Sequence, residues 1–216
     1  MIITCIGHAK FLVELECGLR IVTDPYDATC GYPVTDVRAD VVLVSHGHHD
    51  HNAVETIPGT PRVIDQAGEY ELAEGVRLVA IEACHDDANG AKRGRTLLFS
   101  LHAEGVNVMH LGDLGHVPTA EQCMRLGHAD VLMIPVGGHF TIDAPTAKEV
   151  AALLHARVVL PMHYKTRANE GWPIQPASAF TNLYAQAVEE LDLLRVAGGD
   201  LSCQPEVAVL RPTSLN

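Results

Sequence analysis

The segment "HGHHDH", residues 46–51, crowds four imidazoles and one carboxylate into six positions, directly after the apolar residues 41–44. Imidazole and carboxylate are the ligand types that proteins use for zinc and other first-row transition metals. In extended backbone, the side chains of His46 and His48 lie on the same side of the chain, whereas His49 points away from them. The segment therefore predicts a metal site at the end of a buried strand.

Asp50 and His51 follow that pair, where a turn can bring them back toward it. Two imidazoles and an adjacent Asp-His pair could hold two metal ions side by side. Gly47 removes side-chain bulk where the chain must bend toward the ions. A polar loop of mutually hydrogen-bonded histidines is the alternative, but burying such a cluster without compensation is costly. We therefore favour metal binding.

Two metal ions need more ligands than one loop supplies, and other predicted strands also end at ligand-type residues. "VAIEAC" leads to His85, "NVMHLG" leads to Asp113, and "VVLPM" leads to His163. Each follows an apolar run, so each can lie on one rim of a sheet. We expect these three side chains to join the 46–51 segment.

The elements that must position these side chains are mostly strands in the first half of the chain and alternate between strand and helix in the second. Asn89-Gly90 predicts a hairpin-type turn. Strands are expected within residues 1–7, 10–18, 19–25, 39–46, 62–66, 76–83, 96–103, 106–113, 129–138, 157–164 and 206–212. Helices are expected within residues 118–127, 144–156 and 176–196. Two strand-based layers covered by helices, an α/β architecture, would accommodate this order.

Length and composition bound the class of protein. The 216 residues, 47% of them hydrophobic, fit one domain, residues 1–216, with one sizeable core. No apolar run approaches a membrane span, and the formal net charge of −12 disfavours nucleic-acid binding. The start of the chain has no signal-peptide pattern. The six scattered cysteines fit free thiols in a reducing compartment, so we expect a cytoplasmic protein.

The order HxHxDH, a later His, "GD" and then "PMHY" resembles the metallo-β-lactamase superfamily. "IGHAKFLVEL" followed by "TDPY" is similar to the opening of its L-ascorbate-6-phosphate lactonase-like branch of metal-dependent hydrolases. "PVGGHFTIDAPTA" followed by "VVLPMHYKT" is similar to that branch as well. The resemblance covers most of the chain. It implies a four-layer αβ/βα sandwich, with two central mixed sheets flanked by helices and the site at one edge.

The resemblance also implies how the ligands divide. One metal ion would be held by His46, His48 and His85, the other by Asp50, His51 and His163, and Asp113 would bridge the two. Zinc is the expected metal, and manganese and iron accept the same ligands. A histidine at position 48, where the diiron oxidoreductase branch typically has glutamate, favours hydrolysis.

The expected chemistry is hydrolysis of a small-molecule ester, lactone or phosphorylated metabolite by a metal-bound hydroxide. Asp50 and Asp113 are the catalytic candidates, because their charges offset part of the metal charge and Asp113 would also orient the bridging water. A phosphodiesterase acting on nucleotide, RNA or lipid is one alternative. A non-catalytic metal-binding or sensing protein is another. Members of the branch often assemble, so the resemblance also implies a homo-oligomer.

Further residues are candidates for second contacts around the metal ions or the substrate. Asp24 is expected to accept a hydrogen bond from a ligating imidazole, with a turn cap before Pro25 as the alternative. His8, His139 and Tyr164, with Thr141, could contact the substrate or be structural.

Basic and aromatic residues near the predicted site offer weaker candidates. On the segment after His163, Lys165, Arg167 and Trp172 could bind an anionic substrate or form a solvated loop. The basic residues Lys92, Arg93 and Arg95 are interpreted as a solvated hairpin tip. Structural or surface roles are expected for His102, His110, His116, His128 and His155.

Overall fold

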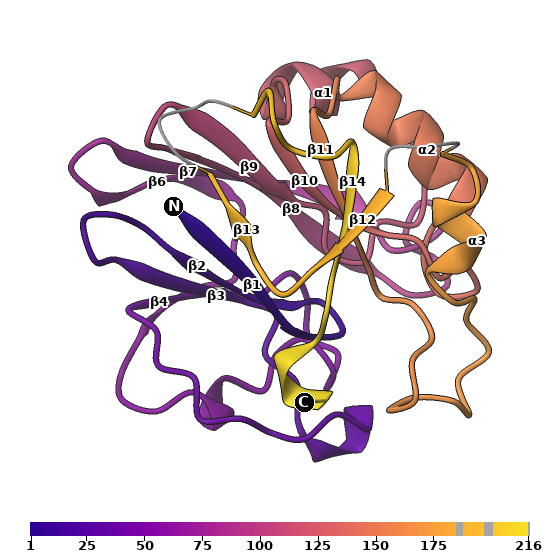
Figure 1. The fold of residues 1–216 in the computed structure, drawn as a ribbon, viewed down its shortest axis with the longest axis horizontal. Helices are drawn as coiled ribbons and strands as arrows, with labels where there is room; N and C mark the ends of the chain where they lie inside the picture. The colour runs from indigo at the N-terminus through magenta and orange to yellow at the C-terminus, as the bar shows by residue number, and fades with distance from the viewer. Residues whose placement is uncertain (185–187, 197–200, 216) are drawn as a thin grey trace.

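Two β-sheets lie face to face in the computed structural model of the chain, which describes residues 1–184, 188–196 and 201–215 (Figure 1). The six-stranded sheet has the order β13-β1-β2-β3-β4-β5. Its strands are β1 Ile2–Gly7, β2 Lys10–Glu14, β3 Arg20–Thr23, β4 Val41–Leu43, β5 Arg62–Ile64 and β13 Leu194–Arg195. Both sheets are mixed, because each contains parallel and antiparallel pairs.

The eight-stranded sheet has the order β12-β14-β11-β10-β9-β8-β7-β6. Its strands are β6 Gly68–Ala73, β7 Val76–Cys84, β8 Arg95–Ala103, β9 Val106–His110, β10 Val131–Pro135, β11 Val158–Met162, β12 Val188–Leu191 and β14 Val207–Leu210. The helices are α1 Ala120–Leu126, α2 Ala144–Leu153 and α3 Ser178–Thr181, with 3-10 helices η1 Ala28–Cys30, η2 Val54–Thr56 and η3 Thr213–Leu215. None of the described helices has the length and apolarity needed to cross a bilayer.

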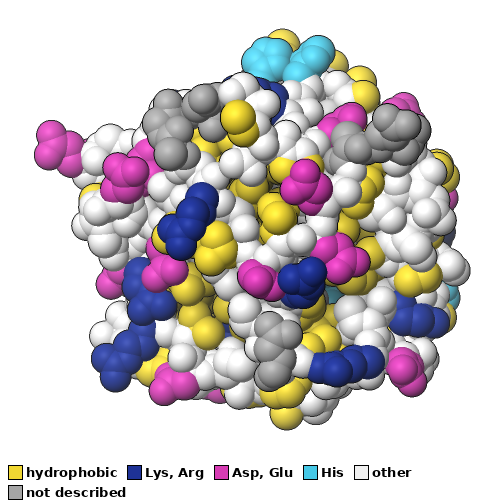
Figure 2. All heavy atoms as spheres, in the orientation of Figure 1, with side chains coloured by type: hydrophobic (Ala, Val, Ile, Leu, Met, Phe, Trp, Pro, Cys, Tyr) yellow, Lys and Arg dark blue, Asp and Glu magenta, His cyan; other side chains and the backbone are white. Residues whose placement is uncertain are grey.

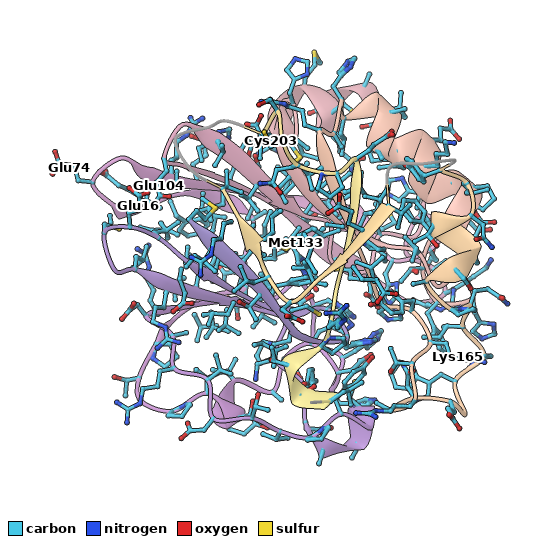
Figure 3. The ribbon with its side chains drawn as sticks, viewed as in Figure 1. Glu16, Glu74, Glu104, Met133, Lys165 and Cys203 are labelled. Atoms are coloured by element: carbon cyan, nitrogen blue, oxygen red, sulfur yellow. The ribbon has the colours of Figure 1, made fainter. Side chains whose placement is uncertain are left out.

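The main core fills the space between the sheets, where side chains from alternate strand positions meet. Met133, at the centre of Figure 3, is 1% exposed there. The opposite face of the eight-stranded sheet is covered by α1, α2 and α3 (Figure 1). The outer face of the six-stranded sheet packs against η2 and the segment before β4. These layers confirm the expected α/β sandwich, with loops and a 3-10 helix forming most of the fourth layer among the described residues.

The strands that lead to the predicted ligands run in one direction within each sheet. β9, β10 and β11 are parallel, and β7 shares their direction because β8 is antiparallel to both β7 and β9. β3 and β4 are parallel, and β1 shares their direction through β2. The carboxyl ends of these strands therefore gather at one edge of each sheet, as the sequence predicts.

Local signals placed two of the three predicted helices correctly. α1 has a capping box in which Thr119 and Gln122 each accept a hydrogen bond from the other's backbone N–H, and it ends at Gly127. α2 begins after Asp143, whose carboxylate accepts a hydrogen bond from the Thr146 N–H. These caps satisfy backbone donors that a helix leaves unpaired at its start.

The prediction of a long helix within residues 176–196 is wrong. The structure has only the short helix α3 there, followed by β12 and β13; residues 185–187 lie outside the described residues. β12 pairs in parallel with β14 in the eight-stranded sheet. β13 pairs antiparallel with β1 at the edge of the six-stranded sheet. Pairing with strands distant in the sequence overrides the local helix propensity of this segment.

Candidate metal centre

The Asp113 carboxylate, just beyond β9, lies between imidazoles from both sheets. Its Oδ2 is 3.2 Å from His85 Nε2, 3.3 Å from His163 Nε2 and 3.8 Å from His46 Nε2. Its Oδ1 is 3.3 Å from His51 Nε2. Four histidines that follow three different strands thus direct ring nitrogens at one buried carboxylate.

Two sets of side chains flank Asp113, each with its ligand atoms within 4.8 Å of one another. We call His46, His48 and His85 the open group, because His48 is exposed and His46 is half-buried. We call His8, Asp50, His51 and His163 the buried group, because every member is buried. The structure thus brings all seven predicted ligands together.

His8 is the addition to the expected sets. Its Nε2 lies 3.2 Å from Asp50 Oδ2, and its ring centroid lies 4.2 Å from that of His163. His49 behaves as predicted: it turns away from the cluster, its side chain is 58% exposed, and its Nδ1 lies 2.9 Å from Thr29 Oγ1.

The polar atoms at the centre fit a bound metal ion. His51 Nε2 and Asp113 Oδ1 are buried without hydrogen-bond partners among the described residues. Buried polar atoms rarely lack partners unless an ion or water supplies one. Both atoms face the other ligand atoms, and imidazole with carboxylate is a donor set suited to zinc, manganese or iron.

Burial and neighbouring charges shift the pKa values of the clustered side chains in different directions. Desolvation, together with His51, lowers the pKa of His46 to about 3, and desolvation lowers that of His8 to about 4. Burial alone would lower the pKa of His51, but Asp113 and Asp24 raise it well above its usual value. Burial would likewise raise the pKa of Asp113, but His163 and His51 hold it well below its usual range. The pKa directions therefore favour a charged Asp113 carboxylate, which is the form that ligates a metal, and the charged form of His51 when no metal is bound.

Asp24, directly after β3, orients two ring systems. Its Oδ2 accepts a hydrogen bond from His51 Nδ1 at 2.8 Å. It also accepts bonds from the Ser45 N–H and hydroxyl, both at 2.7 Å, and Ser45 Oγ lies 2.9 Å from His46 Nδ1. The hydrogen bond expected for Asp24 is therefore present, and a second path through Ser45 reaches the open group. Sequence analysis did not identify Ser45.

Backbone strain concentrates around the cluster. His8, Asp24, His139 and His163 all have positive φ angles, between 37° and 56°. Non-glycine residues rarely adopt this conformation, and it persists where surrounding structure enforces it. The His163 N–H donates to the His8 carbonyl at 3.4 Å, which joins two of these strained positions across the sheets.

Close backbone approach at the site is made possible by glycines other than Gly47. A Cβ added at Gly112 would lie 2.7 Å from the Leu97 carbonyl oxygen, and one at Gly137 would lie 2.2 Å from that of His163. A Cβ at Gly47 would meet no protein atom within 4 Å, so protein packing does not require a glycine there, and the role predicted for Gly47 toward the ions stays a prediction. The packing constraint instead falls where strands of the two sheets converge.

A cavity of about 420 Å³ opens onto the cluster. Its walls contain Trp172, as the sequence suggested, and also Phe140 and Arg93. Phe140 was missed, and the interpretation of Arg93 as part of a solvated tip is wrong. Neither a lone phenylalanine nor a basic residue in a turn carries a sequence signal that distinguishes a cavity wall from a surface.

The other proposed substrate contacts lie further away. His139 is exposed and, with Thr141, lines a neighbouring cavity. Tyr164 packs into the outer hydrophobic core, and neither Lys165 nor Arg167 lines the described cavities. Figure 3 shows Lys165 on the loop that follows β11. These positions support structural or peripheral roles for Thr141, Tyr164, Lys165 and Arg167.

The histidines set aside earlier do not enter the cluster. His110 is buried, and its Nε2 lies 2.9 Å from the Ala9 carbonyl while its Nδ1 accepts the Gly112 N–H. It thus fixes the turn that leads to Asp113. His116 accepts the Cys84 N–H, and His102 lies beside Ser100. The rings of His128 and His155 contact one another at the surface in a tilted arrangement, with centroids 4.9 Å apart.

Charge is mixed on the molecular surface. Figure 2 shows one face, on which Lys and Arg side chains lie among Asp and Glu side chains. Some charges of the molecular surface form pairs, such as Arg211 with Asp192 at 2.9 Å and Arg157 with Asp130 at 3.4 Å. Exposed pairs of this kind contribute little to stability.

Comparison with known proteins agrees with this geometry. Residues 2–163 match the family model described as the β-lactamase superfamily domain. A Pelotomaculum thermopropionicum protein named UPF0173 metal-dependent hydrolase is 30% identical over 90% of this chain and 96% of its own length. A Thermococcus onnurineus protein of the same name is 29% identical over 78% of this chain and 84% of its own length.

Solved structures show the same architecture. A candidate Zn-dependent hydrolase of the metallo-β-lactamase superfamily from Thermotoga maritima is 40% identical, with a TM-score of 0.81 over 97% of both chains. The metallo hydrolase Igni18 from Ignicoccus hospitalis, at 21% identity and a TM-score of 0.68 over 98% of this chain and 95% of its own, shares the fold. The match over most of the chain, together with the His/Asp cluster, shows that the protein belongs to the metallo-β-lactamase superfamily as a metal-dependent hydrolase of the UPF0173 family.

Proposed function

We propose that this chain is a dinuclear metal-dependent hydrolase, close to the L-ascorbate-6-phosphate lactonase-like branch, that acts on a small-molecule ester, lactone or phosphorylated metabolite. The supporting observation is the position of Asp113, whose carboxylate contacts His46 and His85 of the open group and His51 and His163 of the buried group. One carboxylate in contact with two ligand sets is the arrangement that a bridged pair of ions requires.

Each group would hold one ion, zinc before manganese or iron, and Asp113 would contribute to both. Bound divalent ions supply Lewis-acid chemistry and lower the pKa of water at the site. His8 would hold Asp50 in place through its 3.2 Å contact, and Asp24 would fix the tautomer of His51. Phe140 and Trp172 would exclude water from one side of the substrate.

Metal content tests the proposal directly. Protein produced in metal-replete medium should carry about two transition-metal ions per chain by elemental analysis. One ion per chain would reject the dinuclear arrangement, and folded protein that never contains metal would reject the whole proposal.

Asp113→Ala tests the bridging role. The variant should lose at least one ion per chain, and its turnover should fall about 100-fold or more. Loss of a ligand should cost at least as much as loss of a side chain that only hydrogen-bonds to a ligand. Asp36→Ala, at an exposed carboxylate, is the matched control and should keep both properties. Unchanged turnover in Asp113→Ala would reject the role.

A panel of lactones, carboxylic esters and phosphodiesters on the metal-loaded protein tests the substrate class. Hydrolysis of lactones or esters would support the proposal. Preference for phosphodiesters would favour a phosphodiesterase, and no turnover with two bound ions would favour a metal-binding or sensing protein.

All six cysteines are free thiols, which supports a reducing compartment such as the cytoplasm.

A further inference from the structure

The cavity above the cluster combines three kinds of surface. Its floor is made by predicted ligands of both groups together with Asp113. Its walls include the rings of Phe140 and Trp172, whose centroids are 6.1 Å apart with an interplanar angle of 81°. Arg93 is the basic side chain among the lining residues. An apolar wall, a reactive floor and one cation define a shape and charge that a ligand must match.

Arg93 is fixed at this wall by contacts of its own guanidinium. Its Nη2 donates to the His139 carbonyl at 2.9 Å, and its Cζ lies 5.7 Å from the centroid of the Phe140 ring. The side chain is half-buried. A guanidinium held by one N–H and one ring contact keeps further N–H groups for a ligand.

The loop that carries Arg93 is organised by a buried carboxylate. Asp86 is 2% exposed and accepts backbone N–H bonds from Ala88, Gly90, Lys92 and Arg93 at 2.7–2.9 Å. The loop contains the predicted Asn89-Gly90 turn, in which both residues have positive φ. The backbone at Arg93 is therefore preorganised, so a ligand need not order it.

The charge balance of the loop singles out Arg93. Lys92 pairs with Asp87 at 2.6 Å, and Arg95 lies 3.8 Å from Glu82. Within the part of the chain that the structure describes, no carboxylate pairs with Arg93. Arg93 is therefore the basic side chain of this loop whose charge is left for a ligand.

We propose that Arg93 is the specificity-determining residue of this site and that the substrate is a small amphipathic oxyanion. A carboxylate or phosphate group would bind the guanidinium fork, because its planar donors match such oxygens. The apolar part would lie against Phe140 and Trp172, and the bond to be cleaved would lie over Asp113. This inference rests on the proposed hydrolase function, because it assigns the substrate of that site.

Trp172, the single tryptophan of the chain, supplies a binding signal from inside the cavity. We would titrate metal-loaded protein with phenylphosphonate, benzoate and neutral benzamide and follow Trp172 emission. The measured quantity is the ratio of anion affinity to benzamide affinity. Any contact between an anion and bound metal is common to all variants, so changes in the ratio report Arg93.

The ratio should fall about tenfold or more in Arg93→Met, because hydrogen bonds to a charged group are lost. Arg93→Lys keeps the charge without the fork and should give an intermediate ratio, and it also guards against a fold defect in Arg93→Met. Arg95→Met, two residues away and outside the cavity wall, is the matched control and should retain the wild-type ratio. A larger fall with phenylphosphonate than with benzoate would identify phosphate as the recognised group, and the reverse would identify carboxylate.

The proposal is overturned if Arg93→Met keeps the wild-type ratio, if Arg95→Met loses as much, or if no anionic probe binds the wild type. Failure of the hydrolase proposal looks different. Wild-type protein would then lack metal or turnover while its preference for anions still depended on Arg93.

Discussion

The open and buried groups perform the same ligating chemistry in different surroundings. The open group has an exposed His48 that faces the cavity, whereas all members of the buried group are buried, although Asp50 and His163 also line the cavity floor. Asp24 bonds directly to His51 of the buried group but reaches the open group only through Ser45. The buried group is therefore the more enclosed of the two, and the open group is the more accessible from the cavity.

This difference indicates a division of labour. An ion in the buried group would stabilise the fold, because ligands buried as charged or neutral polar groups need a partner. An ion in the open group would exchange more readily and meet the substrate. The following experiments test that asymmetry.

His51→Ala should have the largest effect. In the metal-free protein the charged His51 lies between Asp24 and Asp113, so its removal takes a shared charged partner from two buried carboxylates. We expect the free energy of unfolding of chelated protein to fall by about 3 kcal/mol in urea denaturation at pH 7, along with loss of the buried ion. If the chelated variant is as stable as chelated wild type, the claim that the buried group supports the fold is rejected.

His48→Ala should impair activity without affecting stability. Loss of this ligand should lower turnover about 100-fold and release one ion on dialysis, while the unfolding free energy stays within about 0.5 kcal/mol of wild type. His128→Ala, at an exposed histidine that does not line the cavity, is the control and should change neither property. Equal losses of turnover in the two variants would contradict the ligand role of His48.

Asp24→Asn should weaken both groups unequally. The substitution removes the charge that orients His51 and should reduce retention of the buried ion by about 10- to 100-fold in chelator competition. Ser45→Ala removes the hydroxyl that joins Asp24 to His46 and should affect the open ion more than the buried ion. Equal losses from the two groups in either variant would argue against separate support.

The smallest expected difference between the two groups is the number of protons that each releases when it binds a metal ion. His51, with its raised pKa, must release about one proton when the buried group binds metal at pH 7. His46 and His48 of the open group should release none there, because the pKa of His46 is about 3 and burial also lowers that of His48. Calorimetric titration of chelated protein in buffers of different ionisation enthalpy would count these protons. Equal proton release for the two ions would contradict the assignment.

The same raised pKa predicts how the metal-free protein responds to pH. The stability that charged His51 contributes is fully present below its unfolded pKa of about 6.5. It is lost as pH rises through the higher folded pKa. Denaturation of chelated wild type should therefore become easier in that alkaline direction, and His51→Ala should lack this component.

Sequence reasoning succeeded where local pattern decides structure. The apolar strand before His46, the cap of α1 and the turn at Asn89 all depend on neighbouring residues. It failed for residues 176–196, where β12 and β13 form by pairing with distant strands. Partners from distant parts of the chain leave no mark on the segment they stabilise.

The site divides in the same way. The sequence by itself determined the types of the seven ligand candidates and their places at strand ends, because periodicity and spacing act over a few residues. Only the tertiary structure decided that His8 joins the buried group, that Ser45 links Asp24 to His46, and that Arg93 faces the cavity beside Phe140. Those contacts exist because the two sheets pack face to face with the carboxyl ends of their ligand-bearing strands at one edge, which is a property of the whole fold.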